Sequence, residues 1–188
     1  MDEPEISCGS AADLPAFVEL LEEAGAALWA RGVEQWAPGL SRRQLPQLVA
    51  QVEAGELLVA HSHGRLVGGC VVTSLAASFW ADRPVDAAYL GKLVVAPAVA
   101  GSALGVRIAR RAEDRARGRG FARLRLDCWD RNPRLRRYYR ELGYSELGAA
   151  RLGSYEARLF EKPLRDLRAT VCELPDGQQR LDEAWVGL

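Results

Sequence analysis

The residues best suited to chemistry follow an apolar run near the middle of the chain. Residues 90–95 are mostly aliphatic, Pro97 follows them, and residues 100–105 read Ala-Gly-Ser-Ala-Leu-Gly. A proline cannot donate to a strand ladder, so Pro97 should end the strand. The short side chains then leave backbone N–H groups accessible at the start of a helix, where the helix dipole favours an anion. This pattern predicts a phosphate-binding turn, with an ordinary tight strand-to-helix connection as the alternative.

A second segment with chemical potential covers residues 132–144, Asn-Pro-Arg-Leu-Arg-Arg-Tyr-Tyr-Arg-Glu-Leu-Gly-Tyr. Asn132 and Pro133 are typical of the N-cap and first position of a helix, which Gly143 should end. Periodicity alone makes Asn132 a helix cap and Tyr139 a core aromatic residue. A tyrosine with its ordinary pKa of about 10 is protonated at neutral pH, so Tyr139 could also donate a proton.

In order and separation, the two segments resemble the signatures of the GNAT-type N-acetyltransferase superfamily. The acyl-CoA pyrophosphate loop of that family follows a strand with the pattern Gln/Arg-x-x-Gly-x-Gly/Ala. Its second signature is an Asn followed by a helix that carries a Tyr and ends in Gly-aromatic. The chain departs from the loop pattern at Ala100, where the family has Arg or Gln, and at Ala103, where it usually has Gly. The resemblance covers roughly residues 5 to 162.

The resemblance implies a role for individual residues and acetyl-CoA as acyl donor. Tyr139 would be the general acid for the departing thiolate, and Asn132 would contact the pantetheine arm. A backbone group near Leu93 would polarise the thioester carbonyl. The implied cofactor-binding residues are Leu93, Val94, Val95, Ala100, Gly101, Ser102, Ala103, Leu104, Gly105, Asn132 and Tyr139.

Direct attack by an amine requires a group that removes a proton from its ammonium form. Many relatives place a Glu on the central strand, whereas this chain has Tyr89 and Lys92 there and Asp86 just before it. Asp127 on the next strand and Glu34 after the first helix are further candidates. Each carboxylate has the alternative of being a solvated charge. Asp127 is the one that we predict to be catalytic.

The acceptor pocket is expected between the loop after the first helix, the open end of the central strand and a closing hairpin. Its predicted residues are Trp29, Gln35, Trp36 and Tyr89. The two tryptophans could form an apolar or cation-binding wall, with a core position as the favoured alternative for Trp29. His61 and His63 alternate on one strand, but no carboxylate or cysteine has a matching spacing, so no metal is expected.

The elements around these residues predict an α/β (α+β) fold. We expect a mixed, mostly antiparallel central sheet of about seven strands flanked by about four helices, as in the acyl-CoA N-acyltransferase fold. Expected strands cover residues 5–8, 57–61, 66–73, 90–95, 121–128, 146–151 and 155–160. Expected helices cover residues 11–31, 102–117 and 132–143, and one that begins at Ser41 and ends before Gly55.

Composition limits the classes of partner and compartment. Lys+Arg 25 balances Asp+Glu 25, which argues against a nucleic-acid-binding protein. The four cysteines are scattered without metal-like spacing and favour free thiols in a reducing cytoplasm. Neither a signal peptide nor an apolar run long enough to span a membrane is recognised. We expect an acetyltransferase domain over 1–164 and a C-terminal extension over 165–188, which could serve a homodimer.

These observations predict an acetyl-CoA-dependent N-acetyltransferase that acts on a small-molecule amine or amino-acid-like acceptor by direct attack in a ternary complex. The alternative is a catalytically degenerate domain of the same fold that serves as an acyl-CoA sensor or interaction scaffold. Ala100, Ala103 and the missing central-strand Glu favour that alternative, whereas Tyr139 favours the enzyme.

Overall fold

The computed structural model describes residues 3–33, 35–74, 80, 83–84, 86–153 and 155–164. Glu34, the predicted extension over 165–188 and most of the loop over 76–86 lie outside this description. Among the described residues, no helix is long and apolar enough to cross a membrane.

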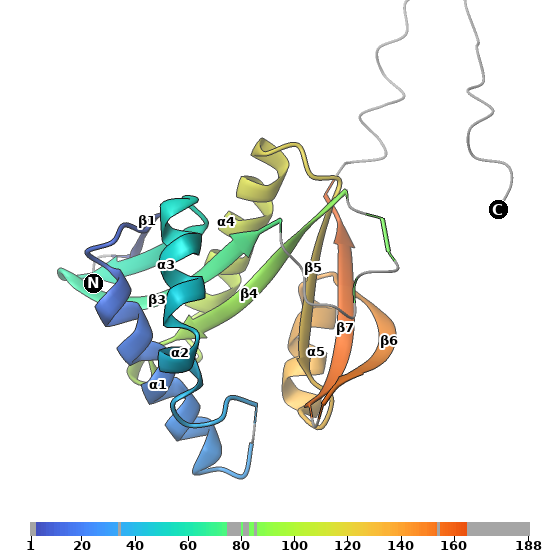
Figure 1. The fold of residues 1–188 in the computed structure, drawn as a ribbon, viewed down its shortest axis with the longest axis horizontal. Coiled ribbons are helices and arrows are strands. Elements are labelled where there is room, and N and C mark those ends of the chain that lie inside the picture. Colours follow the sequence, from blue (N-terminus) through green and yellow to red (C-terminus); the bar gives the residue numbers. More distant parts are fainter. Residues whose placement is uncertain are drawn as a thin grey trace, which may run out of the picture.

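A single seven-stranded sheet has the order β1-β2-β3-β4-β5-β7-β6 (Figure 1). Every neighbouring pair is antiparallel except β4 and β5, which confirms the predicted mixed and mostly antiparallel sheet. The strands are β1 (Glu5–Cys8), β2 (Leu57–Ser62), β3 (Arg65–Thr73), β4 (Ala87–Val95), β5 (Arg123–Trp129), β6 (Ser145–Leu152) and β7 (Tyr155–Pro163).

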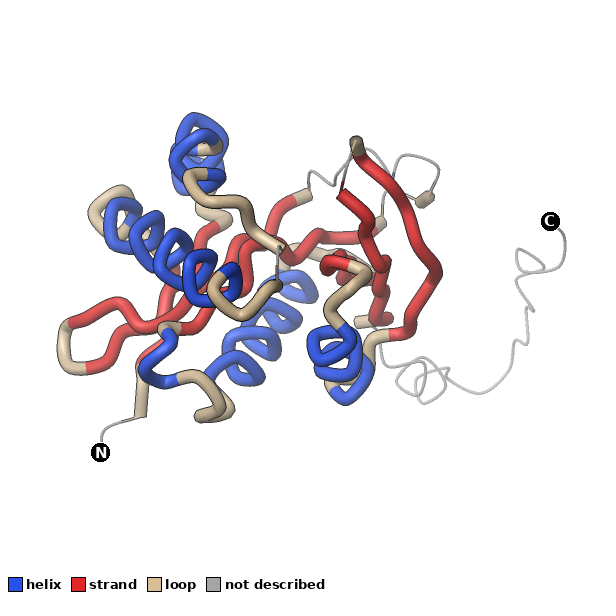
Figure 2. The backbone as a smooth tube through the Cα atoms, turned by 90° about the horizontal axis from the view of Figure 1, so that it is seen from below, coloured by secondary structure: helices blue, strands red, loops and turns tan. Residues whose placement is uncertain are grey.

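Helices cover both faces of the sheet (Figure 2). One face packs against α1 and α3 through Phe17, Leu21 and Leu48, and the other packs against α4 and α5 through Ile108 and other apolar side chains. The helices are α1 (Leu14–Trp29), α2 (Leu40–Arg43), α3 (Leu45–Glu53), α4 (Leu104–Gly118) and α5 (Pro133–Glu141), with a 3-10 turn η2 (Pro97–Val99). The apolar faces of these helices therefore form the two halves of the core.

One helix differs from the expectation. The predicted helix from Ser41 is two pieces, because the backbone leaves helical geometry at Gln44 just before α3, so the described residues contain five α-helices instead of about four. Ser41 is not the N-cap that the sequence predicts. Gly39 takes that position with a left-handed φ of 74°, and the backbone N–H groups of Gly39 and Ser41 both donate to the Glu22 carboxylate.

The central strand β4 changes partner along its length. Its parallel pairing with β5 covers only residues 87–89 of β4, ending at Tyr89 opposite Arg125. From there β4 continues to Val95 alongside β3, while β5 continues alongside β7, so the two strands diverge (Figure 1). The edge of β4 that faces β5 is therefore left without strand pairing after Tyr89.

A β-bulge interrupts β4 within the diverging part. The register with β3 shifts between Gly69 and Val71, opposite Lys92, whose φ of 53° lies in the left-handed region. Before the shift Leu90 packs on the α4 side of the sheet, and after it Leu93 does so as well. An uninterrupted strand would place residues three apart on opposite faces, so the bulge reverses the alternation of side chains.

The turn into α4 contains two left-handed residues. Gly101 has a φ of 88° and Ala103, the N-cap of α4, has a φ of 50°, whereas Ala100 is extended with φ −62° and ψ 137°. Gly101 suits its conformation because glycine adopts positive φ without a steric penalty. Ala103 does not, because its Cβ disfavours the left-handed region.

We predict that Ala103→Gly raises the free energy of unfolding by about 0.5–1 kcal/mol, because glycine relieves the left-handed strain. The matched control is Ala100→Gly, which relieves no strain and should lower stability by about 0.4–1 kcal/mol through the more flexible unfolded chain. Urea unfolding of both variants gives the measurement. Destabilisation by both substitutions would contradict the left-handed conformation of Ala103.

Candidate functional site

A cleft with a volume of about 1190 Å³ lies where β4 and β5 diverge. The cleft is bounded by β4, β5, the start of α4, α5 and the end of α1 with the loop that follows it. Every residue proposed for catalysis, cofactor binding or acceptor binding lines it. These are Trp29, Gln35, Trp36, Tyr89, Leu93, Val94, Val95, Ala100, Gly101, Ser102, Ala103, Leu104, Gly105, Asp127, Asn132 and Tyr139.

The first turn of α4 forms one end of the cleft. No side chain caps this turn, and it contains no acidic residue. The first intrahelical bond comes from the Arg107 N–H to the Ala103 carbonyl, so the preceding N–H groups, starting at Leu104, have no partner within the helix. A Cβ at Gly101 would meet no atom within 4 Å. This end of the cleft therefore offers open, positively polarised donors.

Glycine is needed at position 105 for a different reason than at position 101. A Cβ there would come within 2.9 Å of the Tyr138 hydroxyl oxygen, so glycine lets α5 approach α4 closely. The sequence pattern assigned Gly105 to the approach of a phosphate. In the structure its missing side chain makes room for Tyr138.

Asn132 links two parts of the cleft. Its Oδ1 accepts from the Leu135 N–H at 3.1 Å, which confirms the predicted N-cap of α5. Its Nδ2 donates to Gln35 Oε1 at 3.2 Å, in the loop after α1. The side chain thus caps a helix and joins α5 to the predicted acceptor loop across the cleft.

Tyr139 is both a core residue and a cleft residue. It is only 6% exposed, and its ring packs against Tyr138, Tyr144 and Phe160 with centroid distances of 5.4–6.0 Å. Burial raises its pKa well above the ordinary value, so the phenol stays protonated over the physiological range. Tyr138 also lines the cleft, and burial raises its pKa to about 12.

Asp127 lies on β5 just past the point where β4 leaves it. Its carboxylate accepts hydrogen bonds from the hydroxyls of Tyr89 and Tyr155, the latter at 2.9 Å. Burial raises the pKa of Asp127 to about 6, and the Tyr155 hydrogen bond opposes this by favouring the charged form. A carboxylate poised near neutral pH in a cleft is suited to accept a proton.

The other base candidates are placed less favourably. Asp86 is outside the cleft lining and pairs with the Arg123 guanidinium at 3.3 Å. Lys92 lines the cleft but donates to Gln44 Oε1 at 2.7 Å. Glu34 falls outside the described residues. Asp127 is therefore the carboxylate that the described cleft lining offers.

The acceptor end is lined by aromatic and aliphatic side chains from α1, the following loop and α2. Trp29 is 42% exposed at the end of α1, so the expectation that it belongs to the core is wrong. It lies in the last turn of the helix, beyond the part that packs on the sheet. Trp36 is half-buried against the α1 side of the core and also lines the cleft.

Several cleft residues were not found from the sequence. Tyr155 and Trp129 belong to the far wall, and Gln44 and Arg31 to the acceptor end. Tyr155 starts β7, which pairs with β5 so that Trp129 lies opposite Ala157. The alternation within one strand does not reveal this pairing between strands, so no local signal pointed to Tyr155.

The two histidines of the β2–β3 hairpin have contacts or positions that a structural role explains. The His61 Nε2 lies 3.1 Å from the Asp13 carboxylate, and His63 with φ 49° precedes Gly64 in the turn between β2 and β3. Within the described part of the chain, no cluster of three or more potential metal ligands is found.

Comparison of the sequence with known protein families identifies the family. Residues 19–144 match the acetyltransferase (GNAT) family. The chain belongs to the GNAT family of acetyltransferases. It is 30% identical over 159 residues to an uncharacterized N-acetyltransferase of Bacillus subtilis, YesJ, covering 81% of this chain and 86% of that protein.

Solved structures share the fold. A GNAT-family acetyltransferase from Listeria monocytogenes superposes with a TM-score of 0.71 at 22% identity, covering 85% of this chain and 94% of the other. The yncA protein of Salmonella typhimurium, solved with its cofactor acetyl-CoA, gives a TM-score of 0.66 at 18% identity. The superposition covers 94% of this chain and 100% of the yncA chain. These similarities confirm the predicted acyl-CoA N-acyltransferase fold.

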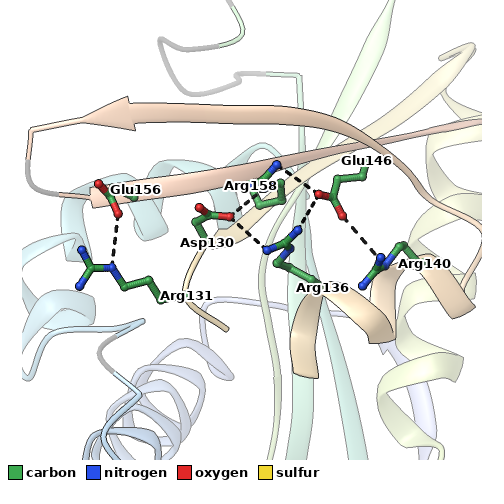
Figure 3. Close-up of polar contacts among 7 residues, drawn as sticks. All are labelled: Asp130, Arg131, Arg136, Arg140, Glu146, Glu156 and Arg158. Atoms are coloured by element: carbon green, nitrogen blue, oxygen red, sulfur yellow. Dashed lines mark hydrogen bonds and ion pairs between the residues drawn. The ribbon is translucent and has the colours of Figure 1, made fainter. Parts of the chain in front are cut away.

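In this GNAT protein, an ion-pair network holds α5, which carries Tyr139, against the closing hairpin (Figure 3). Arg136 lies between Asp130 at 3.6 Å and Glu146 at 2.8 Å, and Arg158 from β7 contacts the same two carboxylates at 2.7 and 3.2 Å. Three elements of the chain therefore meet in a partly buried cluster of alternating charges. The four residues of this network are not part of the cleft lining.

We predict that Arg136→Met lowers the free energy of unfolding by about 1–2 kcal/mol, because it removes charge-assisted hydrogen bonds from a partly buried cluster. Arg137→Met on the same helix is the matched control. Arg137 is 70% exposed and, within the described residues, pairs with Glu141 alone at 3.6 Å, so its loss should change stability by less than about 0.5 kcal/mol. Equal effects in urea unfolding would contradict a special role for the network.

We predict that Asp127→Asn changes the pH dependence of stability. Because the pKa of Asp127 is raised to about 6, the folded state holds this proton more tightly than the unfolded state. Wild-type stability relative to the variant should therefore fall as pH rises from about 4 to 6, by about 3 kcal/mol in total. The asparagine Oδ1 can still accept from the tyrosines. Urea unfolding at several pH values measures the difference.

Asp130→Asn provides a control in which the stability difference from wild type should change with pH in the opposite direction. The Arg158 guanidinium holds the pKa of Asp130 below its usual range, so its ionised form stabilises the folded state. Wild type should gain stability over this variant as pH rises through the acidic range. If both variants show the same trend, Asp127 is not the desolvated carboxylate described above.

Proposed function

We propose that this protein is an acetyl-CoA-dependent N-acetyltransferase that acetylates a small amine or amino-acid-like acceptor by direct attack in a ternary complex. The observation that carries the proposal is the divergence of β4 from β5. After Tyr89 the β5-facing edge of β4 has no strand partner, and the resulting cleft extends to the uncapped first turn of α4. Backbone groups at such an edge can pair with the amides of a pantetheine arm.

The cleft fits an acyl-CoA in two respects. Leu93, Val94 and Val95 supply the edge along which the arm would lie, and the first turn of α4 supplies N–H donors for the pyrophosphate. Ala100 and Ala103 replace side chains of the family pattern, but they leave backbone donors in place. A similar fold, that of yncA, was solved with acetyl-CoA as its cofactor.

Asn132 would contact the pantetheine arm from the start of α5. Arg134, which follows it in the cleft lining, would be the guanidinium nearest to the cofactor phosphates. Arg136, Arg137 and Arg140 have carboxylate partners instead. This division leaves one arginine of the segment for the cofactor and three for the protein's own structure.

Bound acetyl-CoA would supply an acetyl group as a thioester. Asp127 would accept the proton that the acceptor ammonium must lose before its nitrogen can form a bond to the acyl carbon. The Tyr139 hydroxyl would donate its proton to the sulfur as the carbon–sulfur bond breaks. The nitrogen, which carries a surplus proton after the attack, would release that proton to solvent, and Tyr139 would regain one from solvent. A backbone N–H near Leu93 would polarise the acyl oxygen.

The acceptor would enter between the end of α1 and the far wall of the cleft. Trp29 and Trp36 would cover its apolar part, and Gln35 and Tyr89 would offer hydrogen bonds. Tyr89 would also orient Asp127, to which it already donates. The residues over 165–188 are proposed as an extension of this domain and a candidate dimer contact.

Isothermal titration with acetyl-CoA, with free CoA as control, tests the proposal first. Micromolar affinity is expected, since backbone donors form the phosphate site. A screen of amines for thiol release then tests turnover. Absence of binding at millimolar acetyl-CoA would overturn the proposal. Binding without thiol release from any amine would favour the degenerate acyl-CoA-sensing domain.

We predict that Tyr139→Phe lowers kcat by about 100-fold while the Kd for acetyl-CoA stays within threefold, because only the departing thiolate loses its proton donor. Tyr138→Phe is the matched control from the neighbouring position and should change kcat by less than about fivefold. Thiol-release kinetics give kcat and titration gives Kd. Equal rates for Tyr139→Phe and wild type would exclude Tyr139 as the general acid.

A further inference from the structure

The bulge in β4 determines where Lys92 points. Leu93 and Val95 pack with the α4 side of the core, and Val94 packs with the α1 side. Lys92 reaches the N-cap of α3, where its Nζ donates to Gln44 Oε1 at 2.7 Å, so it lies on the α1–α3 side within the cleft. Without the shift in register, position 92 would alternate onto the α4 side with Leu90.

The conformation that achieves this is unfavourable for a lysine. The φ of 53° at Lys92 lies in the left-handed region, which glycine or asparagine adopts far more readily. Strained backbone of this kind concentrates at functional sites, where the surrounding structure holds it in place. Position 92 thus combines an unfavourable backbone conformation with a charged side chain that lines a cleft.

Lys92 has a neutral partner where a carboxylate would be expected. Lys162, elsewhere in the chain, is held by both oxygens of Glu113 at 2.9 Å. Among the described residues, none of the ion pairs includes Lys92. Burial lowers the pKa of Lys92, because desolvation disfavours the charged form of an amine.

The anionic group of the cleft is on the other wall. Asp127 belongs to β5 and is held by Tyr89 and Tyr155. The two groups therefore present opposite charges to the same cleft from the two strands that diverge. An acceptor with both an ammonium and an anionic group would satisfy both walls at once.

We propose that the acceptor is an amine that also carries a carboxylate, and that Lys92 binds this carboxylate while Asp127 faces the amine. An ammonium has three donors, and among the described residues Gln44 accepts from one of them, which leaves two for the two oxygens of a carboxylate. This inference rests on the proposed acetyltransferase activity and makes Lys92 a specificity-determining residue within it.

Thiol release with acetyl-CoA and matched acceptor pairs tests the inference. Each pair is an amino acid, with an α- or ω-amino group and an aliphatic or aromatic body, and its neutral carboxamide. Wild type should show a kcat/KM about 10- to 100-fold higher for the carboxylate, the effect of one charge-assisted contact. Lys92→Met should remove this preference mainly by raising KM, with carboxamide rates within threefold of wild type.

Two controls separate specificity from folding. Arg65→Met removes a cation from the exposed start of β3, outside the cleft lining, and should keep the preference. Acetyl-CoA titration of Lys92→Met should give the wild-type Kd. If that variant does not fold, titration of CoA-bound wild type with each amino acid and its carboxamide provides the same comparison, and only tighter carboxylate binding supports the inference.

The outcomes distinguish the two proposals. Equal use of carboxylates and carboxamides by wild type would overturn the role of Lys92 while leaving the acetyltransferase function in place. Preference for amines with a phosphate, or a preference that survives in Lys92→Met, would also overturn it. Binding of acetyl-CoA without acetylation of any amine would overturn both proposals together.

Discussion

The separation of β4 from β5 is the constraint on which the rest of the molecule depends. The two strands pair only as far as Tyr89 and Arg125, and each then follows its other neighbour. At the last pair Arg125 is 4% exposed, donates to Glu161 on β7 at 2.8 Å and lies over the Trp80 ring at 5.1 Å. Beyond this pair an edge of backbone faces a cleft, so the sheet provides hydrogen-bonding groups that a bound molecule can use.

Three of the functional candidates lie where local stability is reduced. Asp127 is a half-buried carboxylate whose pKa is raised to about 6, Lys92 is a half-buried cation in left-handed backbone, and Ala103 is a left-handed alanine. Each would be more stable as another residue or in another conformation. Because all three surround one cleft, the strain coincides with the chemistry proposed for it.

The remaining structure holds these groups in place. Two apolar clusters, one on each face, clamp the sheet between α1 with α3 and α4 with α5. The charged network of Asp130, Arg136, Glu146 and Arg158 ties α5 to the closing hairpin (Figure 3). Asn132 and Gln35 then connect α5 to the loop after α1 across the cleft. Packed elements therefore surround a site in which one edge of β4 has no strand partner.

The sequence by itself determined the order of elements, because hydrophobic periodicity and caps such as Asn132 act within a few residues. The two family signatures also located the residues that line the cleft. Tertiary structure decided the rest. Pairing of β5 with β7 brought Tyr155 to Asp127, and the end of α1 left Trp29 exposed, where the sequence favoured a core position. The β-bulge in β4 placed the Lys92 side chain within the cleft. The positions of Tyr155 and Lys92 depend on which strands are neighbours and where their register slips, and the alternation within a single strand carries no information about either.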